Sequence, residues 1–388
     1  MQKVHLIRTK RLLGGHLWVF SNELHENPKQ FSAGSLVEVH DMKNIFLGIG
    51  YINPHSLISV RLLTREKDTI DREFFRKKIN EALKLRERLQ GKRHALRIIF
   101  SEGDYLPGLI VDRYGDCIVL QFLTYGIEMF KETIIGLLDE MLNPAIIVLR
   151  NDSRLRRLEG LPQNKELVKG DLGSLPVIEE DGVLFEIDPL EGQKTGFFLD
   201  QSENRAALKK FIKEGKGLDL FCYTGAWAVH LASGGADVTC VDTSGRALEQ
   251  AHINANLNSV AERVSLAEDD VFTFLTKELI KGEKKYDFIV LDPPAFVKSS
   301  NKTKEAVKAY RELNEMSMRL IKRGGILATS SCSYHLSREM FLDMLKSAGK
   351  ISKRDLRLIQ MRSQGPDHPV LLAMPETEYL KCAFLIVD

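Results

Sequence analysis

Short apolar runs alternate with segments of helical periodicity in the second half of the chain, an order typical of a parallel α/β sheet. The pattern predicts a strand over 217–220, a glycine turn, a helix over 226–232 and a strand over 236–242. Further strands are predicted over 183–188, 264–267, 286–291 and 326–330, and further helices begin near 202 and 243. Strand, glycine turn, helix and strand form the first half of a nucleotide-binding βαβ unit, so we expect a Rossmann-like domain over 186–388.

The first half of the chain shows two other patterns. Short strands are predicted over 35–40, 46–51 and 58–63, so residues 1–70 are expected to form a small β domain. A helix is predicted from Asp71, followed by strands over 96–100, 117–122 and 145–150 and a helix over 128–141. We therefore expect residues 71–185 to form a small central α/β domain.

Basic residues gather in two places within this central part. The first group is expected on the outer face of the helix that begins at Asp71, and the second follows the strand over 145–150. The members are Arg72, Arg76, Lys77, Lys78, Lys84, Arg86 and Arg88 in the first group, and Arg150, Arg154, Arg156 and Arg157 in the second. The first group can be read as a solvated face balanced by Glu73, Glu81 and Glu87 or as contacts to RNA, and the second is a local basic cluster.

Composition limits the classes of protein to consider. The chain has 388 residues, enough for two or three domains, and its net charge of +2 does not by itself indicate nucleic-acid binding. Its five scattered cysteines include no C-x-x-C pair, so we expect a cytoplasmic protein without a disulfide framework or a metal site. The N-terminus lacks a signal-peptide pattern, and no run approaches the roughly 20 apolar residues of a membrane span.

The turn at 221–225 favours a ligand that has an adenosine but no phosphates. It contains only Gly225, whereas a dinucleotide site needs three spaced glycines and a P-loop needs a lysine followed by serine or threonine. S-adenosylmethionine is such a ligand. The site would suit it, because Asp219 would attract its cationic groups and Asp242 would accept hydrogen bonds from its ribose hydroxyls. The alternative interpretation is a buried α/β crossover without a ligand.

Two further segments are expected to complete the cofactor site. Asp270, beside an apolar neighbour, would accept the amine of adenine, and the glycine-aromatic loop over 192–201 would form a lid or only a packing loop. The predicted cofactor contacts are Asp219, Phe221, Tyr223, Thr224, Gly225, Asp242, Thr243, Ser244, Asp270, Val271, Phe272, Asp292, Phe198, Asp200 and Gln201.

Two strand ends carry the candidate chemistry. The strand over 286–291 leads to Asp292, and the two prolines that follow stiffen a loop of the form Asp-Pro-Pro-x-aromatic, which is typical of methyl transfer to a planar base. Cys332 follows the strand over 326–330, and parallel strands end at one edge of a sheet, so we expect it beside Asp292. A free cysteine is commonly a small buried hydrophobe, but its position favours a nucleophile here, whereas Cys222 is assigned to packing.

In this order, the motifs resemble the bacterial and archaeal family of PUA-domain-containing 5-methylcytosine methyltransferases of large-subunit ribosomal RNA. The matching segments are 11–20, 102–112, 192–201, 217–226, 286–296, 323–334 and the tail over 367–381. Tyr105 departs from the family pattern, in which a glycine commonly follows the acid at Asp104. The resemblance implies an N-terminal PUA β-barrel, a small central domain and a class I methyltransferase domain with a mostly parallel, seven-stranded sheet.

The resemblance also implies a mechanism. S-adenosylmethionine is the expected cofactor and ribosomal RNA the expected partner, with no membrane association and a possible homodimer. The Cys332 thiolate would add to C6 of a cytosine and make C5 nucleophilic, while Asp292 would hold N3 and the exocyclic amine. The target base would have to leave any stack to reach the pocket. The group that removes the C5 proton is not identified.

Two other functions remain open at this point. An amino-group methyltransferase could use the segment 292–296, with Phe296 stacked on the base, and would need no cysteine. A non-catalytic RNA-binding or assembly protein is also conceivable, although the intact acids Asp219, Asp242 and Asp292 argue against it. The sequence does not indicate which nucleotide is modified, or whether free RNA or an assembled particle is the substrate.

Overall fold

The computed structural model describes residues 1–91, 93–282, 285–296 and 303–388. The chain divides into two compact units, which are described separately. Unit 1 comprises Met1–Ile178, Ile187–Leu199 and Pro366–Thr377, and unit 2 comprises Glu179–Glu186, Asp200–Gly365 and Glu378–Asp388. A short segment near the C-terminus thus belongs to the same unit as the N-terminus, which no pattern in the sequence indicates.

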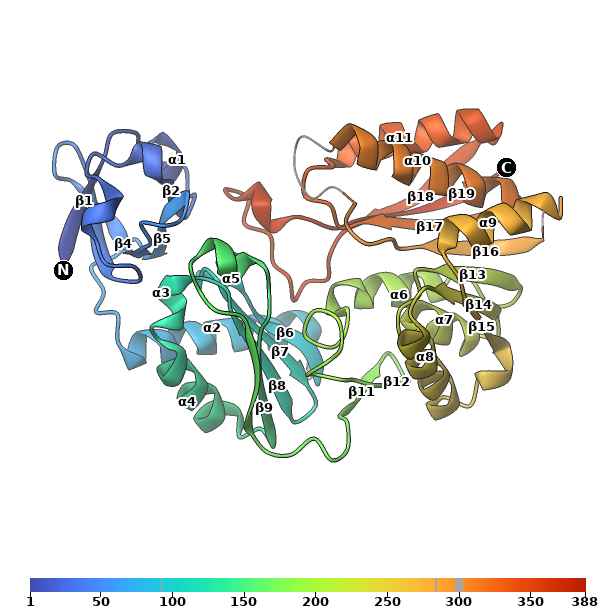
Figure 1. Ribbon diagram of the computed structural model, residues 1–388, viewed down its shortest axis with the longest axis horizontal. Helices are drawn as coiled ribbons and strands as arrows, with labels where there is room; N and C mark the ends of the chain where they lie inside the picture. Colours follow the sequence, from blue (N-terminus) through green and yellow to red (C-terminus); the bar gives the residue numbers. More distant parts are fainter. Residues whose placement is uncertain (92, 283–284, 297–302) are drawn as a thin grey trace. The chain divides into compact units, whose positions relative to one another are not determined.

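The N-terminal part of unit 1 is a five-stranded sheet in the order β1-β3-β4-β5-β2 (Figure 1). Its elements are β1 (Gln2–Leu6), α1 (Lys10–Leu13), β2 (Trp18–Phe20), β3 (Leu36–Asp41), β4 (Phe46–Ile52) and β5 (Ile58–Thr64). Apolar side chains such as Val4, Val37 and Val60 are fully buried and form its core, which also includes Met374 from the C-terminal segment. The small β domain expected from the alternating pattern is therefore present.

The second part of unit 1 is a five-stranded sheet in the order β10-β9-β8-β7-β6 with helices beside it (Figure 1). Its elements are α2 (Arg72–Gln90), β6 (Ala95–Phe100), β7 (Leu109–Tyr114), β8 (Cys117–Phe122), α3 (Tyr125–Glu128), α4 (Lys131–Leu142), β9 (Ile146–Asn151), α5 (Leu155–Leu158) and β10 (Asn164–Lys169). Helix α2 begins after Asp71, whose carboxylate accepts the N–H of Phe74 at 3.0 Å, and ends at Gly91. Phe75 and Ile79 place its apolar face in the core.

Each basic group has buried members, although Lys77, Lys84 and Arg88 of the first group and Arg154 and Arg157 of the second are exposed. Arg86, Arg150 and Arg156 are buried, with 2%, 4% and 1% of their surface exposed. Arg86 forms an ion pair with Asp104, and Arg156 pairs with Glu128 at 2.7 Å. A buried guanidinium must be paired to offset its loss of hydration, so these arginines stabilise the fold and are not available to a nucleic acid.

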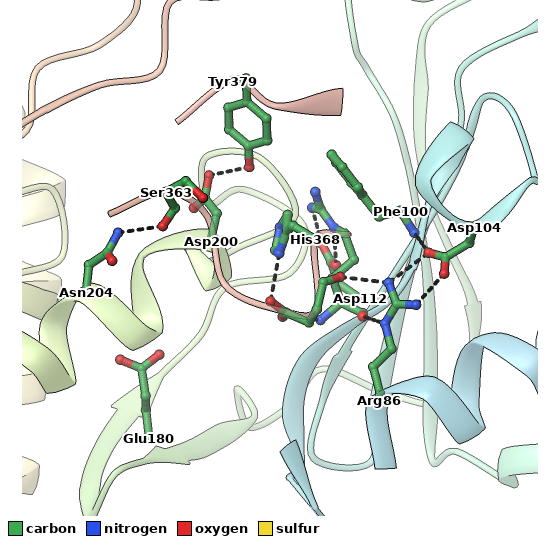
Figure 2. Close-up of polar contacts among 12 residues, drawn as sticks. Arg86, Phe100, Asp104, Asp112, Glu180, Asp200, Asn204, Ser363, His368 and Tyr379 are labelled. Carbon is green, nitrogen blue, oxygen red and sulfur yellow. Dashed lines mark hydrogen bonds and ion pairs between the residues drawn. The ribbon is translucent and has the colours of Figure 1, made fainter. Parts of the chain in front are cut away.

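A buried network of charges ties the C-terminal segment into unit 1 (Figure 2). Arg86 binds the Asp104 carboxylate through both terminal nitrogens and also donates to the carbonyl of Asp367 at 2.7 Å. The carboxylate of Asp367 accepts the backbone N–H of Arg97 at 2.9 Å, while the Arg97 side chain pairs with Asp112 at 2.7 Å. This network holds the tail in unit 1, because removing one partner would leave a buried charge unpaired.

Unit 2 contains a seven-stranded sheet in the order β15-β14-β13-β16-β17-β19-β18. Its strands are β13 (Lys216–Leu220), β14 (Asp237–Asp242), β15 (Val264–Glu268), β16 (Tyr286–Leu291), β17 (Ile321–Ser331), β18 (Leu356–Arg362) and β19 (Lys381–Val387). The pairs from β15 to β17 are parallel, and the pairs of β19 with β17 and β18 are antiparallel. This confirms the mostly parallel, seven-stranded Rossmann-like sheet.

Helices cover both faces of this sheet (Figure 1). They are α6 (Ser202–Lys209), α7 (Ala226–Ala232), α8 (Gly245–Leu257), α9 (Val271–Ile280), α10 (Thr303–Leu320) and α11 (Arg338–Ser352). Helices α6, α7 and α8 pack together on one face and α9, α10 and α11 on the other. A separate two-stranded sheet pairs β11 (Val177–Glu180) with β12 (Val183–Glu186).

Strand β17 is longer than the sequence pattern predicted. It begins at Ile321, and the expected glycine turn at Gly324 and Gly325 lies inside it as an irregularity. Pairing with β16 shifts between the register pairs Tyr286↔Ile321 and Phe288↔Ile326, so the intervening residues bulge outward.

The strand order reverses between β13 and β16, and ligands of open α/β sheets bind at this switch point.

Candidate functional site

The loop after β13 is held in an unusual backbone conformation. Phe221, Tyr223 and Gly225 have φ angles of 61°, 50° and 73°, which is the left-handed region. Such a conformation costs about 1–3 kcal/mol for each residue other than glycine, so it persists only where the surroundings enforce it. Here the N–H of Tyr223 donates to Asp242 at 2.9 Å, and Asn254 donates to the carbonyl of Thr224 at 3.0 Å. The loop is therefore shaped in advance of any ligand.

Asp219 is a fully buried carboxylate beneath this loop. Its Oδ2 accepts the N–H of Ala228 at 3.1 Å, whereas its Oδ1 is buried and has no hydrogen-bond partner among the residues that the structure describes. Burial raises the pKa of Asp219 to about 8, the Ala228 N–H lowers it, and the negative charges of Asp292 and Asp242 raise it further. A cationic group bound here would offset this cost, so the site suits the ammonium of S-adenosylmethionine.

Asp242 and its neighbours shape the turn from β14 into α8. The Asp242 Oδ1 accepts the N–H of Ser244 at 3.0 Å, and its Oδ2 accepts the N–H of Tyr223. Ser244 accepts the N–H of Ala247 at 3.3 Å and so caps α8, while Thr243 is exposed. The predicted binding of ribose hydroxyls by Asp242 stays a prediction, and both of its oxygens already hold the loops in place.

The residues predicted to bind adenine lie at the start of α9. Asp270 is exposed, and its Oδ1 accepts the N–H of Thr273 at 3.0 Å, so it caps the helix. Val271 is buried, and the half-buried Phe272 packs against the core of unit 2. Their contact with adenine remains a prediction.

The loop over 192–201 crosses the boundary between the two units. Phe198 belongs to unit 1, where the ammonium of Lys194 lies 4.3 Å from the centre of its ring. Asp200 and Gln201 belong to unit 2, where the Asp200 carboxylate accepts the hydroxyl of Tyr379 at 2.6 Å (Figure 2). The structure thus places Gln201 beside Asp292 in unit 2, and the contact of Phe198 with the cofactor stays a prediction.

Neutral side-chain donors from two elements hold the Asp292 carboxylate. Its Oδ2 accepts the side-chain N–H of Gln201 at 2.9 Å and the indole N–H of Trp227 at 3.2 Å. Gln201 also donates to Ser330 at 3.3 Å, which joins the ends of β16 and β17. Trp227 lies in the helix predicted over 226–232, and nothing local to it indicates contact with a residue 65 positions away.

Tyr310 connects the two loops that carry the candidate chemistry. Its hydroxyl lies 3.3 Å from the carbonyl of Pro294, 3.4 Å from the N–H of Phe296 and 3.0 Å from the hydroxyl of Ser333. Its side chain is fully buried on α10, and burial raises its pKa. No local pattern in the sequence points to Tyr310, because only the fold brings its hydroxyl to both loops.

Cys332 follows β17 directly, next to the strand that leads to Asp292. It is half-buried, whereas the other four cysteines are buried. Burial raises the pKa of Cys117 and of Cys382 to about 12, and it raises the pKa of Cys222 well above its ordinary value. Cys332 is therefore the most accessible of the five thiols, and its role as a nucleophile and the packing role of Cys222 stay predictions.

Among the described residues, no group of three or more His, Cys, Asp or Glu residues has the arrangement of a metal site. No helix in the described part of the chain is both long enough and apolar enough to cross a membrane.

The chain is similar to known proteins over almost its whole length. Residues 3–65 match a PUA-like domain, and residues 162–351 match an S-adenosylmethionine-dependent methyltransferase family. The chain is 36% identical to ribosomal RNA large subunit methyltransferase I of Pseudoalteromonas atlantica, over 97% of each chain. It is 37% identical to the protein of the same name from Shewanella denitrificans, over 96% of each chain.

Solved structures show the same fold. A methyltransferase structure complexed with SAH has a TM-score of 0.87 and 21% sequence identity, and the match covers 100% of both chains. A SAM-dependent methyltransferase structure from Streptococcus mutans has a TM-score of 0.85 and 21% identity, again over 100% of both chains.

Proposed function

Since the chain belongs to the family of S-adenosylmethionine-dependent methyltransferases that includes the ribosomal RNA large subunit methyltransferases I, we propose that it methylates C5 of a cytosine in large-subunit ribosomal RNA. The observation that carries the proposal is the position of Cys332, which follows the strand beside the one that leads to Asp292. A thiol and a carboxylate at one sheet edge, next to a cofactor loop, are the groups that C5 chemistry requires.

The cofactor would be held by the loop over 221–225 and the acids around it. Asp219 would bind its ammonium, and Asp242 and Asp270 would bind the ribose hydroxyls and the adenine amine. When bound, S-adenosylmethionine supplies an electrophilic methyl group on a sulfonium. The unpaired Oδ1 of Asp219 supports this assignment, because a buried carboxylate oxygen without a donor calls for a cation.

Cytosine C5 is a weak nucleophile, and Cys332 would overcome this. Addition of the Cys332 thiolate to C6 breaks the C5–C6 double bond and makes C5 electron-rich, while Asp292 would accept from the exocyclic amine and share a proton with N3, where the negative charge develops. After methylation, loss of the C5 proton restores the double bond and expels the thiolate. Gln201 and Trp227 hold the Asp292 carboxylate through hydrogen bonds from neutral donors and so orient it.

The packing of Phe296 supports C5 over amino-group transfer. An amino-group methyltransferase with the segment 292–296 would stack the aromatic residue on its target base. The Phe296 ring lies 4.8 Å from the ring of Tyr310 and 6.4 Å from that of Phe221, and it packs against the core of unit 2. These neighbours compete with a base for the ring.

RNA binding would use the N-terminal part of the chain. Domains are proposed over 1–70, 71–185 and 186–388, with the first as the RNA-binding module. Lys77, Lys84 and Arg88 are exposed on α2 and could contact phosphates. With several basic residues buried, we expect only a few phosphate contacts and a modest dependence of affinity on salt.

Mapping the methylated nucleosides of ribosomal RNA by mass spectrometry tests the proposed function. RNA from cells that lack the protein is compared with RNA from the parent cells, and we expect one 5-methylcytosine to disappear. Incubating that RNA with the purified protein and labelled cofactor should restore it, either on naked RNA or on assembled particles. The loss of an N-methylated base instead would identify an amino-group methyltransferase, and an unchanged map would remove the proposal.

Replacing Tyr310 with phenylalanine is expected to lower kcat by about 10- to 100-fold with little change in cofactor affinity, because the hydroxyl aligns the loops of Asp292 and Cys332. Steady-state kinetics and calorimetry measure these quantities. The matched control is Tyr286→Phe, since the Tyr286 hydroxyl donates to Glu278 at 2.7 Å elsewhere in unit 2. Both variants should lose about 1 kcal/mol of stability, and equal kcat losses in both would contradict the role of Tyr310.

A further inference from the structure

Lys381 is a buried cation next to the backbone that carries Cys332. It lies on β19, opposite Ser331 of β17 in the antiparallel register, and only 6% of its surface is exposed. Its Nζ donates to the carbonyl of Ser333 at 2.6 Å and to that of Tyr379 at 2.9 Å. The backbone of Lys381 is thus paired with the residue before Cys332, and its ammonium is hydrogen-bonded to the residue after it.

The pairing of this ammonium is unusual for a buried lysine. Among the described residues, no carboxylate lies within ion-pair distance of the Lys381 ammonium, and it donates to two neutral carbonyls. An ammonium has three N–H groups, so one remains beyond these two bonds. Burial lowers the pKa of Lys381 to about 8, and the negative charges of Cys332 and Glu378 raise it. The charge of Lys381 is therefore coupled to that of Cys332.

Several other titratable groups lie around Lys381 and Cys332. They are Tyr310 on α10, Asp292 after β16, Arg362 on β18, the exposed Glu378 on the segment before β19, and the exposed His335 after Cys332. Asp292 and Glu378 are negative and disfavour a thiolate nearby, and Tyr310 is a neutral phenol. Lys381 is the buried cation among them whose hydrogen bond reaches the backbone beside Cys332.

We propose that Lys381 is a positioning residue that holds Cys332 in its thiolate form and fixes the backbone on both sides of it. The inference rests on the proposed function, in which Cys332 is the nucleophile. The thiol proton goes to solvent before the RNA base arrives, the thiolate adds to C6, and the same thiolate leaves after the C5 proton is lost. Lys381 stays an ammonium throughout and transfers no proton.

Alkylation of Cys332 by iodoacetamide tests this assignment without RNA. The full-length protein is treated between pH 5.5 and 9.5, the rate at Cys332 is followed by peptide mass spectrometry, and Cys332→Ala provides the blank. The four other cysteines are buried and should react slowly. We expect the wild-type rate to reach half its maximum well below the pH of about 8.5 that is usual for a thiol.

Two variants separate charge from packing. Lys381→Met keeps the volume but removes the charge, and we expect its half-maximum to move up by about one to two pH units. Lys381→Arg keeps the charge and should stay within about half a pH unit of the wild type. In methylation assays the methionine variant should lose 10-fold or more in kcat at pH 7, recover part of it at pH 9, and bind cofactor normally.

A half-maximum of the wild type at or above about 8.5 would overturn the inference even if no variant folds. An unchanged profile in Lys381→Met would overturn it as well. These results are independent of the proposed function, which would fail instead if Cys332→Ala still methylated RNA. A low half-maximum together with an active Cys332→Ala variant would mean that the thiolate exists but has another use.

Discussion

Replacing Cys332 with alanine is expected to abolish methylation of ribosomal RNA and to leave cofactor affinity within about twofold of the wild type. Without the thiolate, no group in the site can add to C6, and C5 stays too weak a nucleophile to attack the methyl group. Loss of a covalent nucleophile lowers kcat by roughly 10⁴-fold or more. Transfer of labelled methyl groups to RNA from cells that lack the protein measures the first quantity, and calorimetry measures the second.

The matched control is Cys117→Ala, which removes a buried thiol from β8 in unit 1. This variant should lose about 1–2 kcal/mol of stability through the cavity it leaves, but it should keep its activity. Retained methylation by Cys332→Ala would exclude the cysteine adduct and favour amino-group transfer. Loss of both activity and cofactor binding would instead show that the substitution had disturbed the sheet edge, and Cys332→Ser would then be the variant to measure.

The sheet of unit 2 was predictable because its determinants are local. Buried parallel strands are continuous apolar runs, and β13, β14 and β16 each occur close to the predicted ranges. Strand ends then place Asp219, Asp292 and Cys332 at one edge without any knowledge of packing. The starts of two helices were also predictable, and Asp71 and Ser244 cap these helices in the structure.

What could not be predicted depends on contacts between distant parts of the chain. Arg86 belongs to a basic run, and such a run predicts an exposed helix face. The Arg86 side chain is instead buried, where it donates to the carboxylate of Asp104 and to the carbonyl of Asp367. Trp227, Tyr310 and Lys381 belong to apolar or helical stretches that show no chemistry by themselves. Each becomes part of the site only because the fold brings its polar atom to the loop of Asp292 or Cys332.

The buried carboxylate of Asp219 links cofactor binding to stability. Its pKa of about 8 lies far above the value of about 4 in an unfolded chain, so ionisation opposes folding. This contribution to stability is fully present below pH 4 and is lost as pH rises towards 8. At pH 8 the upper bound of the loss is about 5 kcal/mol. A bound ammonium would offset this loss of stability, because it stabilises the ionised form of Asp219.

Replacing Asp219 with asparagine should therefore stabilise the cofactor-free protein and weaken cofactor binding. We expect the free energy of unfolding at pH 7.5 to rise by about 1–3 kcal/mol, and the gain to shrink towards pH 5. Affinity for S-adenosylmethionine should fall by 100-fold or more. In the wild type this affinity should rise by up to about tenfold per pH unit between pH 6 and 7.5, as Asp219 ionises. The pH dependence of the affinity should vanish in the variant.

Denaturant unfolding and calorimetry across this pH range measure both effects. The matched control is Asp237→Asn, since Asp237 lies on β14 of the same sheet with an exposed side chain that pairs with Arg263. It should change neither stability nor affinity by more than about 0.5 kcal/mol. A destabilised Asp219→Asn protein with normal affinity would mean that Asp219 is a structural acid bound to Ala228 alone, and that another group receives the ammonium. A stabilised variant that binds poorly would identify Asp219 as a residue whose unfavourable burial is retained for the cofactor.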